Sequence, residues 1–238
     1  MTAAVGISEP QHHPDEGVLM DYAAGAAHEG AGVLIATHLA LCPTCRATVK
    51  RLESLGGALV ADLPPSPLDP ALRTSVLAQL DEPEAKVAPR PAPAVKTSPQ
   101  PIVVLPRPLR DYAGGTIADL PWRRVGPGIE LIELTLGGAA RQSAKERAEE
   151  HMRLFRIGAG HAIPRHTHHG TEMVLVLSGG FRDGGRQFRR GDVSLSDQQI
   201  DHSPKVDKDA DCICLSVTDA PLRLTGLVGR ILNLFVRF

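Results

Sequence analysis

The sequence predicts an α + β protein of two domains, a small helical N-terminal domain and an all-β C-terminal domain built as a barrel or jelly roll. Three observations support this prediction. Apolar residues recur at helical spacing within residues 1–81. Residues 82–110 are dominated by proline and alanine, which favours a semi-rigid extended linker. Residues 111–238 hold short apolar runs separated by Gly, Asp and Pro turns, a pattern typical of small antiparallel barrels.

The composition argues against several classes of protein. The 238 residues carry a formal net charge of −1 and a pI near 6.8, which gives no electrostatic footprint for nucleic acid or an anionic membrane. No apolar run approaches the roughly 20 residues that span a bilayer, and the first ten residues lack the features of a secretory signal. The four cysteines form two local pairs, which indicates metal or redox chemistry in a reducing cytoplasm.

Three helices are expected in the first domain, after a segment at residues 1–10 that reads as disordered. The first helix begins near Pro14, where proline and the acids that follow suit a first turn, and Gly25 is a plausible end. Gly56-Gly57 is expected to interrupt the third helix, with a brief continuation over residues 58–63. The expected helices cover approximately residues 14–24, 31–41 and 43–55.

A fourth helix is expected over residues 69–81, beyond the sharp break at Pro64-Pro65-Ser66-Pro67. Its apolar residues fall on one face: Leu72, Val76, Leu77 and Leu80. Two interpretations fit this face equally well. It packs against the three-helix core, or it is a surface offered to a partner protein.

The strongest chemical signal in the first domain is the run His38-x3-Cys42-x2-Cys45. On a helix, His38 and Cys42 lie one turn apart on the same side, and Cys45 follows just after Pro43, a residue tolerated at the start of a new helix. Two thiols and an imidazole suit tetrahedral Zn2+ with one position left for a further residue. The alternatives are a redox Cys-x-x-Cys pair, or two buried cysteines beside an unrelated histidine.

The fourth donor of this site is expected to come from the entrance of the first helix. His12 and His13 both lie there, and either could reach the cluster if the helices pack in antiparallel fashion. The pattern alone favours neither.

In the second domain, short strands are expected around a tight hairpin turn at Gly184-Gly185. The charged residues 141–150 are expected to form a loop or frayed turn, and the apolar residues 227–238 an added strand or short helix. The expected strands cover residues 129–136, 151–157, 173–177, 187–190, 193–195, 212–217 and 222–226.

A second cluster of ligand-type residues falls within these strands. His166 and His168 point to the same side of an extended strand because side chains alternate with period two. Glu172 opens the next apolar strand, and His202 follows the turn at Gly191-Asp192. Three imidazoles and a carboxylate directed into a barrel predict a divalent-metal site.

Two further groups in this domain are expected to stay outside the metal site. His169 points away from its neighbours and is not expected to be a ligand. Cys212 and Cys214 alternate on one strand face and are expected to be small buried residues rather than a redox pair.

Together, the two clusters resemble the ChrR-type zinc-binding anti-sigma factors, in which a helical zinc anti-sigma domain is joined to a C-terminal cupin. In the first half the resemblance rests on the cysteine run, with Ala36-Thr37-His38-Leu39 before Cys42, and on His13, separated by eight residues from Tyr22-Ala23-Ala24-Gly25. In the second half it rests on the cupin motif, its strand-ending glycine and one later histidine: His166, His168, Glu172, Gly179 and His202.

The resemblance implies a function and a ligand set. It selects His13 over His12 as the fourth zinc donor, and it implies that the helical domain binds an extracytoplasmic-function sigma factor and withholds it from RNA polymerase. It further implies release under oxidative stress, including singlet oxygen, and a divalent metal in the cupin, with zinc as the first choice. Such a regulator acts on a protein in the cytoplasm and does not bind DNA or a membrane directly. The long Pro/Ala-rich linker departs from the family pattern and argues against fixed docking of the two domains.

Two other functions fit parts of the sequence. A cupin with three histidines and a glutamate also serves as a dioxygenase or isomerase when it binds iron or manganese, and the helical domain would then be a regulatory appendage. Alternatively, Cys42 and Cys45 form a zinc–thiol redox sensor that ejects its metal on oxidation.

Overall fold

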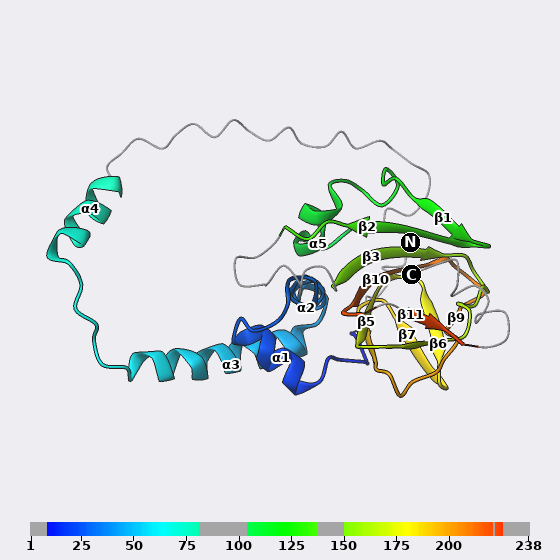
Figure 1. The fold of residues 1–238 in the computed structure, drawn as a ribbon, viewed down its shortest axis with the longest axis horizontal. Helices are drawn as coiled ribbons and strands as arrows, with labels where there is room; N and C mark the ends of the chain where they lie inside the picture. Colours follow the sequence, from blue (N-terminus) through cyan, green and yellow to red (C-terminus); the bar gives the residue numbers. More distant parts are fainter. Residues whose placement is uncertain (1–8, 81–103, 138–149, 221, 226–238) are drawn as a thin grey trace, which may run out of the picture.

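The computed structural model describes residues 9–80, 104–137, 150–220 and 222–225, and it contains a helical N-terminal part beside a β-rich C-terminal part (Figure 1). The prediction of an α + β protein with an all-β second domain is confirmed. Of the segment expected to be disordered, residues 1–10, the first eight lie outside the described residues, as do most of the charged loop and the apolar tail. Pro10 is described and is buried, contrary to that expectation. The helices are α1 Glu16–Ala23, α2 Glu29–Leu41, α3 Pro43–Ala61, α4 Pro70–Leu80 and α5 Arg107–Ala113.

The strands within the described residues form three antiparallel sheets. The largest has the order β1-β2-β3-β10-β5-β8, and the smaller ones are β7-β6-β9 and β11-β4. Their bounds are β1 Arg123–Gly126, β2 Ile129–Leu134, β3 His151–Ile157, β4 His166–His168, β5 Glu172–Ser178, β6 Gly180–Asp183, β7 Arg186–Arg189, β8 Val193–Ser196, β9 Lys205–Val206, β10 Cys212–Thr218 and β11 Leu222–Leu224.

The large sheet is buried on both faces, and this explains the continuous apolar run of β5. On β10, Leu215 and Val217 pack in one core cluster together with α2, whereas Cys212 and Cys214 pack in a second cluster against the β7-β6-β9 sheet. Side chains alternate between the two faces of a strand, so successive residues enter different cores. The molecule therefore has three layers, with helices, the large sheet and the small sheets in that order.

The helical part packs firmly on the barrel, so the expectation of domains without fixed docking is wrong. Val33, Leu34 and Ile35 of α2 share one core cluster with strand residues such as Leu154 and Leu215. The outer face of the large sheet is apolar, and burying such a face contributes roughly 25 cal/mol per Å2. Helix α2 provides that cover.

The predicted linker also ends earlier than expected. The composition predicts a linker up to residue 110, but residues 107–110 form the first turn of α5. Leu109 and Leu105 are fully and almost fully buried, respectively. Proline is tolerated at the start of a helix because its missing N–H has no intrahelical partner there. The proline-rich composition therefore hid a short helix that packs against α2.

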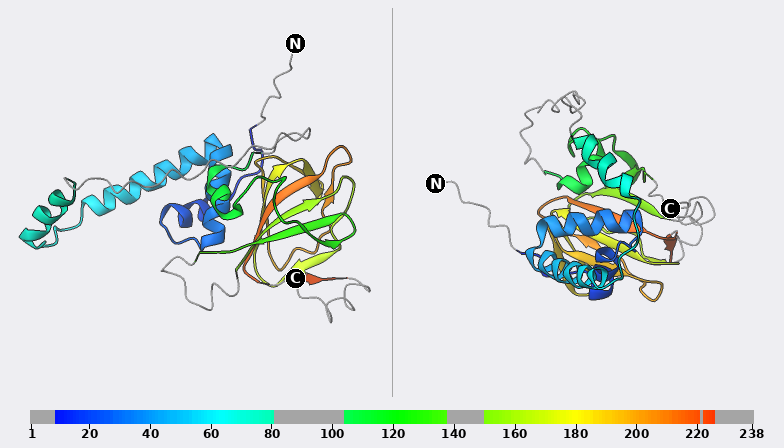
Figure 2. Two further views of the ribbon diagram at one scale, coloured as in Figure 1. Left: turned by 90° about the horizontal axis from the view of Figure 1, so that it is seen from above. Right: turned by 90° about the vertical axis from the view of Figure 1, so that its left-hand side faces the viewer.

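Helix α3 continues through Gly56-Gly57, contrary to the predicted interruption. An added Cβ at either glycine would meet nothing within 4 Å, so no packing requirement explains these residues. Each glycine costs a helix about 1 kcal/mol relative to alanine, which the surrounding turns tolerate here. Figures 1 and 2 show α3 projecting away from the barrel, with α4 beyond its far end.

Helix α4 is exposed along its whole length and buries no residue. The interpretation that it packs against the helical core is wrong within the described part of the chain. The exposed apolar side chains continue from the end of α3 into α4, and we refer to residues 55–80 as the apolar arm. Its large exposed apolar residues are Leu55, Leu59, Val60, Leu63, Leu68, Leu72, Val76, Leu77 and Leu80.

Candidate metal centres

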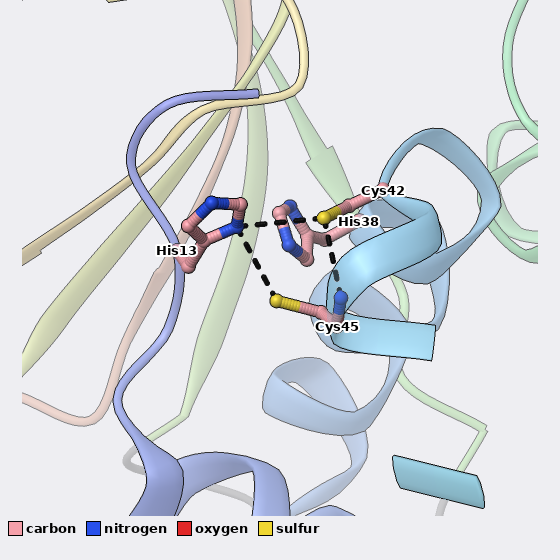
Figure 3. A group of neighbouring side chains, drawn as sticks. All are labelled: His13, His38, Cys42 and Cys45. Carbon is pink, nitrogen blue, oxygen red and sulfur yellow. Dashed lines mark hydrogen bonds between the residues drawn. The ribbon is translucent and has the colours of Figure 1, made fainter. Parts of the chain in front are cut away.

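The first centre brings together His13, His38, Cys42 and Cys45, whose ligand atoms all lie within 4.8 Å of one another. The sulfur atoms of Cys42 and Cys45 each lie 3.4 Å from Nδ1 of His13. Figure 3 shows the four side chains turned toward a common point from three segments. These are the chain before α1, the last turn of α2 and the first turn of α3.

The hydrogen bond of one ring nitrogen of His38 leaves the other ring nitrogen available to bind a metal ion. Its Nδ1 lies 2.8 Å from the carbonyl oxygen of Gly191, and a carbonyl only accepts, so Nδ1 carries the hydrogen. The lone pair is then on Nε2, which is buried without a hydrogen-bond partner among the described residues. Burial lowers the pKa of His38 and keeps the ring neutral, the form that binds metals.

The two thiols also favour a cation between them. Both are buried and free, and the N–H of Cys45 donates to Sγ of Cys42, which is the N-cap of α3. Burial, together with the neighbouring Cys42 thiol, raises the pKa of Cys45 to about 12. Two adjacent thiolates therefore require a positive charge close by. Two sulfurs and two imidazole nitrogens are a donor set that Zn2+ prefers.

The structure separates the two candidate histidines before α1. The ring of His12 turns to the barrel, where its centroid lies 4.5 Å from that of Phe188 with the two rings tilted by 38°. Its Nε2 lies 3.0 Å from the carbonyl oxygen of Gln187. His13 faces the cysteines. Of the two histidines, His13 is therefore the one whose ring lies with the two cysteines and His38.

The second centre lies inside the barrel and contains His166, His168, Glu172 and His202, again with ligand atoms within 4.8 Å of one another. β4 supplies two histidines and the first residue of β5 supplies the glutamate. His202 is held opposite His166 by a pair of 3.0 Å backbone hydrogen bonds. All four residues predicted from the sequence meet here.

The hydrogen bonds around this centre leave lone pairs facing one another. Nδ1 of His166 lies 2.8 Å from the carbonyl oxygen of Pro164, and Nδ1 of His202 lies 2.6 Å from a carboxylate oxygen of Asp183. Both Nδ1 atoms therefore carry hydrogens, and the two bare Nε2 atoms lie 3.1 Å apart. Such a pair is repulsive unless a cation lies between the nitrogens, so the donor set fits a metal ion.

His168 and Glu172 complete this donor set. Nε2 of His168 lies 3.0 Å from Nε2 of His202 and 3.7 Å from Oε2 of Glu172. Burial, reinforced by the other two histidines, lowers the pKa of His168 to about 4. Burial raises the pKa of Glu172, whose Oε1 accepts a hydrogen bond from Ser216 at 2.9 Å. Neutral imidazoles beside a buried carboxyl are a suitable environment for a divalent cation.

A cavity of about 630 Å3 opens beside this second centre. It is lined mainly by apolar side chains, which come from all three sheets, with His166, Glu172 and His202 on its wall. Cavities of this size accommodate small organic molecules. The barrel can therefore admit a small ligand to the residues of the second centre.

The second cysteine pair belongs to neither centre. Cys212 and Cys214 are buried free thiols in the core cluster between the sheets, as the sequence predicts. A hydrogen bond between its thiol and Cys212, together with burial, raises the pKa of Cys214 well above that of an ordinary thiol. A protonated buried thiol is a poor nucleophile, and neither of these cysteines belongs to a group of potential metal ligands among the described residues.

Sequence reasoning missed the residues that orient the ligands. The carbonyl of Gly191 and the carboxylate of Asp183 each fix the tautomer of one histidine. Backbone acceptors leave no residue-type signal, and Asp183 looks like an ordinary hairpin residue. The sequence predicts a turn at Gly191-Asp192, but it does not indicate that this turn contacts His38.

Among the helices that the structure describes, none combines the length and the apolar character needed to cross a membrane.

Both the helical part and the β-rich part of the chain are similar to known proteins of one kind. Residues 112–221 match the family described as the ChrR cupin-like domain. The anti-sigma-E factor ChrR of Cereibacter sphaeroides is 38% identical over 227 residues, which cover 95% of this chain and 98% of that protein. The crystal structure of Rhodobacter sphaeroides SigE in complex with the anti-sigma ChrR superposes with a TM-score of 0.73 at 37% identity, over 88% of this chain and 100% of that chain.

Proposed function

Because this chain belongs to the ChrR family of anti-sigma factors, we propose that it binds an extracytoplasmic-function sigma factor and withholds it from RNA polymerase. The similarity extends through the helices as well as the barrel. The structural observation that carries the proposal is the apolar arm, residues 55–80, which presents nine large exposed apolar side chains. The arm is the sigma-binding element in this proposal.

An exposed apolar surface of this size is unusual for a protein that acts alone. Two helices that project from the body can enter a groove of a partner and bury their apolar side chains there, as amphipathic helices do. The net charge of −1 offers no comparable surface for nucleic acid. A protein partner is therefore the occupant that the arm favours.

We assign Zn2+ to the first centre, with His13, His38, Cys42 and Cys45 as its ligands. The bound ion would join three chain segments in a small helical unit, where a structural zinc supplies on the order of 10 kcal/mol of folding free energy. This keeps α3, and with it the arm, in a fixed direction. To the second centre we assign a divalent metal, with zinc as the first choice.

The finer part of the proposal is release of the sigma factor under oxidative stress, including singlet oxygen. The sulfurs of the first centre are poorly placed to meet an oxidant, since Cys42 is 1% and Cys45 3% exposed. Oxidation of cysteine follows accessibility and thiolate character. The barrel, with its cavity beside the second centre, is the more accessible receiver of a signal.

The test is binding of the full chain to candidate sigma factors of this class, by co-expression and pull-down, followed by inhibition of transcription in vitro. Val76→Asp places a charge on the apolar face of α4, and Thr74→Asp adds the same charge on the opposite face. If the arm is the binding element, Val76→Asp weakens binding roughly 10-fold or more, as loss of a buried anchor does, and Thr74→Asp does not. Equal effects of both variants would contradict the assignment of the arm.

A second candidate function is turnover of a small molecule in the barrel. The observation that favours it is the cavity of about 630 Å3 with three metal-binding side chains on its wall. Incubation of the iron-, manganese- and zinc-loaded protein with small dioxygenase substrates tests this, with His168→Ala as the control. Turnover by the parent protein that the control lacks would establish it.

A further inference from the structure

The turn between β7 and β8 touches the N-terminal segment through one buried carboxylate. Oδ1 of Asp192 accepts hydrogen bonds from the N–H groups of Gln11 at 2.6 Å and His12 at 3.0 Å. Oδ2 of Asp192 accepts from the N–H of Arg189 at 2.7 Å. The residue is 3% exposed, so both oxygens are engaged away from water. One side chain of the barrel thus holds the chain just before the first metal centre.

Other contacts press the same segment onto the barrel. The N–H of Val193 donates to the carbonyl oxygen of His12 at 3.0 Å. Gly191 has φ +93°, and an added Cβ there would lie 2.6 Å from Cγ of Pro10. Backbone hydrogen bonds and side-chain contacts therefore fix residues 10–12 on the barrel. His13 is the next residue, so the position of this segment determines where its ring lies.

The turn also reaches the opposite side of the first centre. The carbonyl oxygen of Gly191 accepts a hydrogen bond from Nδ1 of His38. The N–H of Gly191 donates to the carbonyl oxygen of Val176 at 2.8 Å. The N–H of Val176 in turn donates to the carbonyl oxygen of Asp192 at 3.1 Å. Strand β5 thereby fixes the turn, and the turn orients two of the four donors of a centre that lies outside the barrel.

We propose that Asp192 is a positioning residue of the first metal centre, acting on the metal through His13 and His38 without contacting it. The inference rests on the proposed zinc assignment and is independent of sigma-factor binding. It means that the affinity of the N-terminal domain for its metal depends on a turn of the cupin barrel. Outer residues that orient metal ligands commonly contribute 10- to 100-fold to metal affinity.

Replacement of Asp192 by Asn tests this with little change in volume. An amide offers one acceptor oxygen where the carboxylate offers two, and its NH2 group would face a backbone N–H. At least one of the three hydrogen bonds is lost, so residues 10–13 loosen and His13 occupies its position less often. We expect zinc affinity at the first centre to fall about 10-fold or more.

The matched control is Asp211→Asn. Asp211 also caps a turn of the barrel, where it accepts from the N–H of Ala159 at 3.0 Å, and it belongs to neither metal-binding group. The full-length proteins are compared by zinc competition with a chromophoric chelator and by Co2+ substitution. The sulfur-to-cobalt charge-transfer band reports the first centre, because among the described groups of potential ligands only this one contains cysteine.

The expected result is weaker zinc binding and an altered charge-transfer band in Asp192→Asn, with one metal equivalent retained in the barrel and with the control unchanged. Parent-like affinity and spectrum in a folded Asp192→Asn protein would overturn the inference, as would an equal effect in the control. Absence of the band in the parent protein would instead refute the zinc assignment itself.

If Asp192→Asn does not fold, His12→Ala decides the question by the same criteria. It removes the ring that packs against Phe188 and leaves the barrel turn and the metal ligands in place. We expect a several-fold loss of zinc affinity in the same direction, within the range for outer-shell changes. Unchanged zinc affinity and cobalt spectrum in this variant would then overturn the inference.

Discussion

The side chain of Glu150 caps α2 from 120 residues further along the chain than Gly30, because its Oε2 accepts a hydrogen bond from the N–H of Gly30 at 3.1 Å. Its Oε1 accepts from the N–H of Ala31 at the same distance. His28, the N-cap residue of α2, makes no capping hydrogen bond with its own side chain. The barrel therefore supplies the cap, and with it a negative charge at the positive end of the helix dipole.

Glu150→Gln is expected to loosen the docking of α2 on the barrel. It removes the charge and one of the two acceptors, which we expect to cost about 1 kcal/mol of unfolding free energy. Hydrogen exchange at the first turn of α2 should accelerate, and the thermal midpoint should fall. Glu53→Gln, on the exposed part of α3, is the control. Protection of α2 equal to that of the parent would show that the cap is dispensable.

Gly30→Ala is expected to have the same effect by a steric route. An added Cβ would lie 2.9 Å from Oε1 of Glu150 and 3.2 Å from a methyl group of Val217. Helix propensity alone would stabilise the variant by about 1 kcal/mol, so a net loss of stability identifies the close contact. Gly32→Ala, where an added Cβ meets nothing within 4 Å, should stabilise the protein. Chemical denaturation of both variants distinguishes the two effects.

Cys42→Ser is expected to abolish metal binding at the first centre. It removes a thiolate ligand and the sulfur that accepts from the N–H of Cys45, so residues 13–60 should loosen and sigma-factor inhibition should be lost. Metal analysis and transcription assays on the same preparation measure both effects, and treatment with a chelator should reproduce them. Cys212→Ser, which alters a thiol outside both centres, should retain inhibition. A Cys42→Ser protein with full zinc content that still inhibits would refute the assignment.

The sequence predicted local structure better than the contacts between parts of the chain. The alternation of His166 and His168 on one strand is a property of backbone geometry, so these residues meet as expected. By contrast, Leu105 and Leu109 lie in a proline-rich stretch, and only the apolar face of α2 explains why they are buried. An apolar helix face has the same sequence pattern whether it packs on a neighbouring helix or on a sheet, so the sequence could not predict which element covers it.

The same distinction applies to the metal centres. The spacing of His38, Cys42 and Cys45 follows from one turn of helix, and it could be read directly. The choice between His12 and His13 depends on the barrel, which holds His12 against Phe188 and thereby turns His13 to the cysteines. Contacts between segments far apart in the chain leave no local sequence pattern, so the residue pattern alone could not predict this choice.

A fragment that ends near Glu82 is expected to bind the sigma factor with an affinity close to that of the full chain. The apolar arm lies beyond the part of α3 that packs on the body, so its side chains do not depend on the barrel. The fragment should be less stable, because the face of α2 that covers the large sheet becomes exposed. Titration of zinc-loaded fragment and full chain with the sigma factor compares them. A folded, zinc-loaded fragment without affinity would mean that the barrel forms part of the binding surface.

His168→Ala is expected to separate inhibition from signalling. The variant removes one of the three imidazoles of the second centre, so metal content should fall to about one equivalent per chain, retained by the first centre. Sigma-factor binding should persist because the arm and the first centre are untouched, whereas release under oxidative stress should be blunted. His169→Ala, which alters the adjacent histidine outside the centre, is the matched control and should behave as the parent. Metal content, sigma-factor binding and stress-induced transcription are measured on both variants.

Loss of binding with the first centre loaded would mean that the barrel helps to hold the partner. Unchanged induction without the barrel metal would mean that the second centre is structural, and that Cys42 and Cys45 receive the signal.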